Sequence, residues 1–308
     1  KTLQRQANAS IAGAAGMATG GAALRVGGMA AQAGIDFGEQ MSAVGALARV
    51  DKTSEAYQHM SDQAQKLGAT TSFSASQAAG GMRFLAMAGF EVSDILETMP
   101  GMLDLAKAGG ADLASTADIA SNVLSGFRLE ASQMGRVSDV LAATFTRSNV
   151  DLGMLGETMK YVAPIASELG TSVEEASAMA GLLGNIGIQG SKAGTAMRAL
   201  HTRMASPPKK AKEALDEIGV STRTASGDLR SMTDLLADVA VKTEDMGNAD
   251  RIKAFTAIAG QEAGAAMAGL VADGGSGEIT KFTEILEGAS GEAARVAKKM
   301  GDNAAGDI

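Results

Sequence analysis

The stretch TSVEEASAMAGLLGNIGIQGSKAGTAMRAL, residues 171–200, contains two helical patterns separated by a glycine-rich turn. Ser172 and Glu175 stand three residues apart, which is the spacing of a capping box at the start of a helix. Gly187 predicts the end of that helix in a left-handed conformation, and Ser191 is a candidate cap for the next helix. We therefore expect a helical hairpin over this stretch.

The same stretch contains Gly-Ser-Lys after several glycines, a composition that also occurs in phosphate-binding loops. A Walker A loop needs Gly-Lys-Ser/Thr in that order, between a strand and a helix. Here Ser191 separates Gly190 from Lys192, and residues 173–185 have the composition of a helix. We expect Lys192 to be an exposed first-turn residue, and an NTPase function is disfavoured.

Helix caps and closing glycines recur along the chain, which predicts a series of short helices and helical hairpins. Ser206 before Pro207 predicts a further helix start, and Gly68 predicts a helix end. Because alternating β-branched runs are absent, the predicted fold class is all-α. The other pairs of cap and closing glycine are Ser74 (with Gln77 at capping-box spacing) and Gly89, Asp112 and Gly126, and Asp151 and Gly170.

Beyond Gly219 the sequence predicts a turn-rich connector and then more short helices. A glycine-rich joint is expected at residues 271–278 between two of them. The expected helices cover residues 229–243, 249–259, 261–272, 279–287 and 291 onward.

Near the start of the chain, glycine recurs at a seven-residue period, which is typical of helices that supercoil around one another. Small residues at that period let helix backbones approach closely, so we expect a coiled coil or bundle of several copies, as a trimer or hexamer. Membrane insertion of Ile11–Ile35 is the alternative, but Arg25 lies near its middle, where a charge costs about 2.5–3.5 kcal/mol. The glycines of this seam are Gly13, Gly20, Gly27 and Gly34.

Composition restricts the classes of function. The chain has 308 residues, a formal net charge of −8 and no cysteine, which excludes disulfides and thiolate chemistry and argues against a general nucleic-acid binder. Only 3% of residues are aromatic, while 18 are Met, so we expect a soft interior of Met and small aliphatic side chains and a low, weakly cooperative stability. No aromatic side chain interleaves with the basic stretch 191–230, which predicts a solvated helical face.

Candidate catalytic and metal-ligating residues are few. His59 and His201 stand far apart without carboxylates at ligand spacing, so we expect both on the surface. Glu174 and Glu175 are adjacent and point in different directions on a helix, which does not suit an acid–base pair. We expect no enzyme activity, cofactor or metal.

Residues 117–170 and 171–220 closely resemble the core region of phage tail tape measure proteins. The matching elements follow in order: residues 176–194, the AGTAMRAL helix at 193–200, and a proline-initiated helix that ends in EIGV. The resemblance runs over residues 37–300 and contains no catalytic motif.

The resemblance implies a structural protein in the lumen of a phage tail, or of a phage-like particle, that sets tail length and leaves ahead of the DNA at infection. The implied partners are the tail tube protein, hub or baseplate proteins and tail assembly chaperones. The implied locations are the virion tail, the host cytoplasm during assembly and the host envelope after ejection. A membrane-active helical protein that assists a channel through the envelope is the alternative.

Three parts are expected along the chain. Residues 1–36 form a Gly/Ala-rich helical or tether segment, residues 37–220 the tape measure core, and residues 221–308 a C-terminal helical extension. The start at Lys1 and the end in GDNAAGDI lead us to expect a segment of a longer polypeptide.

Overall fold

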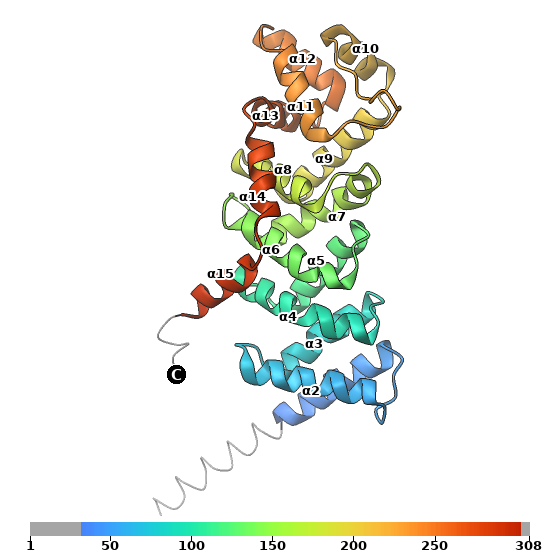
Figure 1. Ribbon diagram of the computed structural model, residues 1–308, viewed down its shortest axis with the longest axis vertical. Coiled ribbons are helices and arrows are strands. Elements are labelled where there is room, and N and C mark those ends of the chain that lie inside the picture. The colour runs from blue at the N-terminus through green and yellow to red at the C-terminus, as the bar shows by residue number, and fades with distance from the viewer. Residues whose placement is uncertain (1–31, 303–308) are drawn as a thin grey trace, which may run out of the picture. The chain divides into compact units, whose positions relative to one another are not determined.

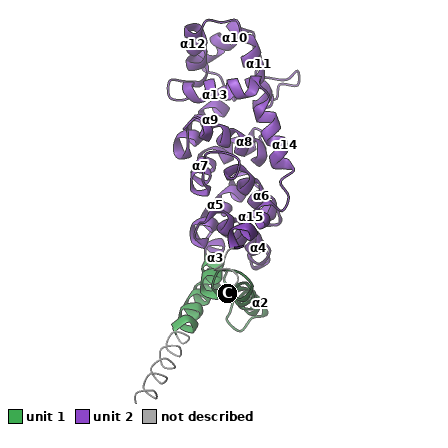
Figure 2. Ribbon diagram, turned by 90° about the vertical axis from the view of Figure 1, so that its left-hand side faces the viewer, with its two compact units in different colours: residues 1–83 green, residues 84–308 purple. Residues whose placement is uncertain are grey.

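The computed structural model describes residues 32–302, which are mainly helical (Figure 1). They divide into two compact units, residues 32–83 and 84–302, and the boundary falls inside helix α3 (Ala75–Met87) (Figure 2). Within the described residues the β pairing is limited to one isolated bridge, between Arg223 and Leu229. The prediction of an all-α fold is confirmed, whereas the domain divisions at residues 36 and 220 stay predictions.

The first unit contains a helix over residues 32–47, helix α2 (Glu55–Thr70) and the start of α3. Ser54 caps α2, because its side chain accepts a hydrogen bond from the Tyr57 amide. The expected helix end at Gly68 is wrong, since α2 continues to Thr70. A Cβ at Gly68 would lie 2.4 Å from the backbone nitrogen of Ala75, so this glycine permits a close approach of the chain instead.

The second unit begins with helical hairpins that follow one another along the chain (Figure 1). Its interior is filled by Met, Leu, Val and Ala, with few aromatic rings, in agreement with the expected soft core. The first helices of this unit are α4 (Val92–Gly109), α5 (Leu113–Gly126), the 3-10 turn η1 (Ala131–Gln133), α6 (Met134–Phe145), α7 (Leu152–Glu168), α8 (Val173–Asn185), α9 (Gly190–Ala205) and α10 (Lys209–Ile218).

Three of the closing glycines have left-handed backbones: Gly89, Gly170 and Gly187 have φ values of 89°, 79° and 81°. After Gly187, the Ile188 amide donates to the Leu183 carbonyl at 2.9 Å, which is the closing bond of a Schellman motif. Gly126 differs, because it is the last residue of α5 and the positive φ belongs to Arg128.

Two predicted helix caps are wrong. Ser191 lies inside α9, which begins at Gly190 after Gln189 and has no side-chain cap. Ser206 follows the end of α9, and Pro208 rather than Ser206 precedes α10. In both cases a neighbouring residue with an extended backbone takes the cap position, so the serine hydroxyl is not placed to accept from the first turn.

The last part of the chain turns back along the second unit. Helices α14 and α15 pass beside α8 and α6 and end against α4 (Figure 1). The predicted joint at residues 271–278 is too long, because α13 continues to Gly275 and only Ser276 and Gly277 separate it from α14. These helices are α11 (Met232–Lys242), α12 (Asn248–Ala259), α13 (Gly264–Gly275), α14 (Glu278–Glu287) and α15 (Glu292–Gly301).

Candidate functional site

Lys192 is exposed in the first turn of α9, where the sequence placed it. It lines a groove of about 640 Å³ between α9 and the residues that connect α12 to α13. Much of the groove wall is alanine, and Arg203 at its edge donates to the carbonyls of Ile258 and Ala257 at 2.6 and 3.0 Å. The Arg203 guanidinium is thus occupied by carbonyls at the end of α12, and Lys192 lies on a helix. The groove therefore lacks the glycine-rich loop of backbone amides that binds phosphate in a Walker A motif.

Gly194 explains one glycine of this stretch by helix packing. A Cβ at this position would lie 2.6 Å from the Thr158 carbonyl oxygen and 2.8 Å from the Tyr161 Cβ. Helix α9 therefore approaches the backbone of α7 more closely than any larger residue allows. The hydroxyl of Thr158 also donates to the Gly190 carbonyl at 3.1 Å, which joins the two helices further.

The side chain of Glu175 does not close the predicted capping box. Ser172 caps α8 by accepting from the Glu175 amide at 3.1 Å, as the motif requires. The Glu175 carboxylate instead accepts from the amide and hydroxyl of Thr233, at 3.0 and 2.6 Å. Because Thr233 lies in the first turn of α11, a carboxylate from α8 satisfies the start of α11, together with the cap residue Ser231.

Glu174 is buried and pairs with Arg136 of α6 through two hydrogen bonds. The Arg136 Nε and Nη2 atoms lie 2.6 and 2.7 Å from the two carboxylate oxygens. Hydrogen bonding to Glu174 raises the pKa of Arg136. This two-pronged pair joins α6 to α8 and leaves no free carboxylate for acid–base work.

His201 is fully buried, so the expectation that it lies on the surface is wrong, whereas His59 is exposed. The Nδ1 atom of His201 lies 2.8 Å from the Met197 carbonyl oxygen. Because a carbonyl only accepts hydrogen bonds, Nδ1 carries the proton. Nε2 then accepts from the Thr171 hydroxyl at 3.2 Å. Burial lowers the pKa of His201 and keeps the ring neutral, which suits a packed structural residue.

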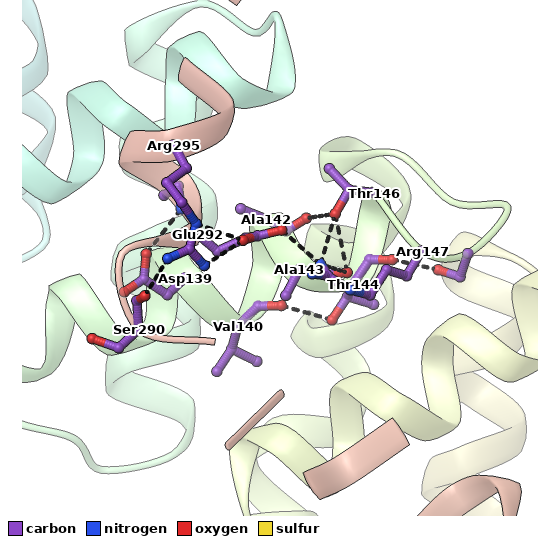
Figure 3. Close-up of polar contacts among 12 residues, drawn as sticks. Asp139, Val140, Ala142, Ala143, Thr144, Thr146, Arg147, Ser290, Glu292 and Arg295 are labelled. Carbon is purple, nitrogen blue, oxygen red and sulfur yellow. Dashed lines mark hydrogen bonds and ion pairs between the residues drawn. The ribbon is translucent and has the colours of Figure 1, made fainter. Parts of the chain in front are cut away.

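A polar cluster holds the start of α15 against α6, and we call it the latch (Figure 3). The Asp139 carboxylate accepts from the backbone amides of Gly291 and Ala293 at 2.7 and 2.9 Å. Glu292 lies between two guanidinium groups, with Arg147 at 2.7 Å and Arg295 at 2.6 Å. The latch consists of Asp139, Arg147, Glu292 and Arg295.

The electrostatics of the latch follow from these contacts. Hydrogen bonding from Arg295, and then from Arg147, lowers the pKa of Glu292 against the opposing effect of burial. Burial, followed by the nearby charge of Asp139, raises the pKa of Asp104 on α4, and Lys107 opposes this. Both carboxylates of the latch accept hydrogen bonds, Asp139 from backbone amides and Glu292 from the two arginines. The latch is therefore a satisfied polar network that stabilises the contact between segments about 150 residues apart.

The remaining predicted residues are spread over the chain and do not converge. Ser74 and Gln77 form the reciprocal bonds of a capping box, at 3.1 and 2.8 Å, and Asp112 accepts from the Ser115 amide at 2.9 Å. Gly34 lies in the helix over residues 32–47, and a Cβ there would meet nothing within 4 Å. Gly13, Gly20 and Gly27 lie outside the described residues.

Two further properties of residues 32–302 concern function directly. Among these residues, no three His, Asp or Glu side chains gather in a way that could hold a metal ion. None of the described helices combines the length and the apolar character that crossing a membrane requires.

Comparison with known proteins identifies the family of the chain. Residues 61–260, well over half of the chain, match the model of a family described as phage-related minor tail protein. The chain belongs to the phage-related minor tail protein family.

Two curated relatives are similar to the chain over nearly its whole length. The tape measure protein of Pneumococcus phage Dp-1 is 38% identical over 275 residues, which are 89% of the chain and 24% of the relative. The probable tape measure protein of Escherichia phage P2 is 32% identical over 303 residues, which are 98% of the chain and 37% of the relative. The resemblance inferred from the sequence is confirmed, and the chain spans only 24% and 37% of the length of these two relatives. No solved structure matches the chain.

Sequence reasoning missed the contacts that join distant helices of the chain. Asp139 carries no local signal for its role, because the amides it binds lie more than 150 positions further along the chain. Arg136 and Glu174 likewise stand 38 positions apart. One available signal was the sequence Gly-x-Ala at residues 291–293, because a helix that begins at a glycine has no side chain to cap it. The backbone N–H groups of its first turn then need a hydrogen-bond acceptor from elsewhere in the chain.

Proposed function

We propose that this chain is a structural segment of a tail tape measure protein, which lies in the lumen of a phage or phage-like tail and sets its length. The main support is that 89% and 98% of the chain are similar to two proteins that are named as tape measure proteins. The fold supports the proposal, because the described residues are a series of short helices whose specific polar contacts join those helices to one another, which suits a structural segment.

The proposed partners follow from this function. They are the tail tube protein, hub or baseplate proteins and tail assembly chaperones, and membership of a tail protein family supports association with other tail components. We further propose that copies associate as a trimer or hexamer through the glycine seam, and that the segment performs no catalysis. The proposed locations outside the tail are the host cytoplasm during assembly and the host envelope after ejection.

Block deletion in the parent gene tests the ruler function. Removing residues 113–170, which include α5, α6 and α7, shortens the tail by on the order of 1.5 Å per deleted residue if the segment is helical and extended in the tube. Electron microscopy of purified tails measures the change. Replacing the same block with an unrelated helical sequence of equal length is the matched control and restores tail length. Unchanged length after the deletion would reject the proposal.

The competing function is membrane activity, for which the apolar residues 11–35 are the specific observation. It predicts dye release from lipid vesicles by the purified chain and loss of release when residues 1–36 are removed. The ruler function predicts no release in either case. The two functions are therefore separated by one assay on two proteins.

A further inference from the structure

Helices α14 and α15, residues 278–301, form an element that we call the strap (Figure 1). The strap packs against α8, α6 and α4, which precede it by about 100 residues or more. Its buried residues recur at helical spacing, while Lys281, Glu284 and Lys298 on its other side are exposed. The buried residues are Ile279, Phe282, Leu286, Ala289, Ala293 and Ala297.

The surface under the strap, which we call the seat, is shaped to receive it. Phe282 lies over Gly181 of α8, where a Cβ would come within 2.9 Å of both the Phe282 ring and the Ser148 hydroxyl. At the other end, the latch residues Asp139 and Arg147 bind the first turn of α15. The seat therefore recognises the strap by a ring-sized hollow and by a directional polar contact.

A single residue sets the direction in which the strap leaves α13. Ser276 still has a helical backbone, with φ −82° and ψ −8°, and its amide bonds to the Ala272 carbonyl as in a helix. Gly277 has φ 76° and ψ 10°, and α14 begins at the next residue. If Gly277 took a right-handed conformation, α13 and α14 would become one helix over residues 264–287, and the strap would leave its seat.

Helix α13 would stay in place during such a change. Its last residues are packed against α11, since a Cβ at Gly275 would lie 2.6 Å from the Ala240 Cβ, and one at Gly274 would lie 3.1 Å from the Ala237 nitrogen. The strap would then project from the body with its apolar face uncovered, and the empty seat would also be exposed. The apolar face of the strap would then need another seat to cover it, and the empty seat would need another strap.

We propose that the seat is an interaction surface for the strap of a second copy of this chain, and that Gly277 is the hinge of this exchange. Every contact of the closed molecule is available between two copies, so only the hinge conformation and the chain concentration separate the two states. The interface is distinct from the glycine seam, and the proposal does not depend on whether the parent protein sets tail length.

The hinge makes the first test simple. Gly277→Ala strains only the closed state, because a Cβ there meets nothing within 4 Å but the left-handed backbone disfavours alanine. A cost of about 1.4 kcal/mol per hinge is a tenfold change, so a reciprocal dimer with two relaxed hinges binds about a hundredfold more tightly. Sedimentation velocity over a concentration series measures this dissociation constant.

Gly291→Ala is the matched control for that measurement. Gly291 has nearly the same backbone, φ 75°, and an added Cβ would meet only the Arg295 Nη1 at 3.7 Å. It lies within the strap, so it weakens seating equally in one copy or between two and does not favour exchange. Any association through the glycine seam is the same in the unmodified chain and in the two variants, so it does not affect their comparison. Equal association of Gly277→Ala and Gly291→Ala would overturn the proposal.

Complementation tests the seat itself. Gly181→Leu fills the hollow for Phe282 and leaves the strap intact, while Phe282→Asp damages the strap and leaves the seat intact. We expect each variant alone to show only the background association and a mixture of the two to form an additional one-to-one complex. A protein with both changes, mixed with either single variant in turn, identifies which seat and strap are used. Circular dichroism establishes that each variant is folded. If the folded single variants gain no association on mixing, the seat does not accept a strap from another copy.

Discussion

The Glu175 carboxylate on α8 accepts two hydrogen bonds from Thr233 on α11, one from its amide at 3.0 Å and one from its hydroxyl at 2.6 Å. This contact joins the central hairpin to a helix that begins more than 50 residues later. It also places a negative charge at the helix end where the backbone dipole is positive. The start of α11 thus depends on a residue of another helix as well as on its own cap, Ser231.

Removing this carboxylate should destabilise the protein at α11. We expect Glu175→Ala to lower the free energy of unfolding by about 2 kcal/mol, because hydrogen bonds to a charged group contribute about 1.5–3 kcal/mol. Glu175→Gln keeps an acceptor oxygen and should cost less. Urea unfolding of Glu175→Ala, of Thr233→Val and of the variant with both changes provides a double-mutant cycle, and Glu175→Gln is measured beside them. Additive effects of Glu175→Ala and Thr233→Val would contradict a direct contact.

Local patterns predicted helices well, and Glu175 shows where such patterns stop. Ser172 and Glu175 have the spacing of a capping box, and the bond from the Glu175 amide to the Ser172 hydroxyl forms. That bond depends only on residues close together in the sequence. The carboxylate half was taken by Thr233, which no local pattern could indicate. His201 was misplaced for the same reason, since burial depends on which helices pack over α9 and not on the spacing of polar residues. The uncapped start of α15 at Gly291 suggested that a partner was needed, but the sequence could not identify Asp139 as that partner, because the two lie about 150 residues apart.

The Arg136–Glu174 pair should respond asymmetrically to mutation. The Glu174 side chain is 3% exposed and that of Arg136 is 47% exposed. Arg136→Met leaves a buried carboxylate without its partner, and we expect a loss of about 2 kcal/mol, below the about 3–5 kcal/mol of fully buried pairs because the site borders solvent. Glu174→Gln leaves only a neutral amide and should cost about 1 kcal/mol.

Arg128–Glu168 provides the matched control for that pair, since its side chains are 72% and 59% exposed at 2.8 Å. Arg128→Met should change the free energy of unfolding by at most about 1 kcal/mol. Urea denaturation at pH 7 compares all three variants. The assignment of Glu174 as the buried, dependent member fails if Arg136→Met is as mild as Arg128→Met.

His201 should make stability depend on pH above the range where carboxylates titrate. Burial lowers its pKa in the folded state below the ordinary value of 6.5. As pH falls through about 6.5, the unfolded state therefore binds a proton first, and the free energy of unfolding decreases by at most about 1.4 kcal/mol per pH unit. Below the folded pKa this loss stops growing. Thermal unfolding between pH 7.5 and pH 5.5 measures the slope.

Two variants assign that slope to one residue. His201→Gln removes the titrating ring and should flatten the dependence, although the variant itself loses stability because Gln fits the bonds to Met197 and Thr171 less well. His59→Gln changes an exposed residue and should keep the slope of the unmodified chain. A slope that survives in His201→Gln would mean that another group titrates in this range.

Gly194 should prove to be a packing residue in a simple substitution test, like Gly181 and Gly184, at which an added Cβ would also meet other side chains closely. Gly194→Ala would place a Cβ 2.6 Å from the Thr158 carbonyl oxygen, and backbone cannot move aside without separating α7 from α9. We expect the free energy of unfolding to fall by about 1–3 kcal/mol, although alanine improves helix propensity by about 1 kcal/mol.

Gly135→Ala is the control for Gly194→Ala, because Gly135 lies in α6 and an added Cβ would meet nothing within 4 Å. With no collision, only the helix propensity changes, and we expect a gain of about 0.5–1 kcal/mol. The two substitutions are chemically identical and should have opposite signs in the same denaturation experiment. If both are stabilising, α9 does not approach α7 as closely as the structure shows, and the glycine content of residues 181–194 would need a different explanation, such as contact with a ligand.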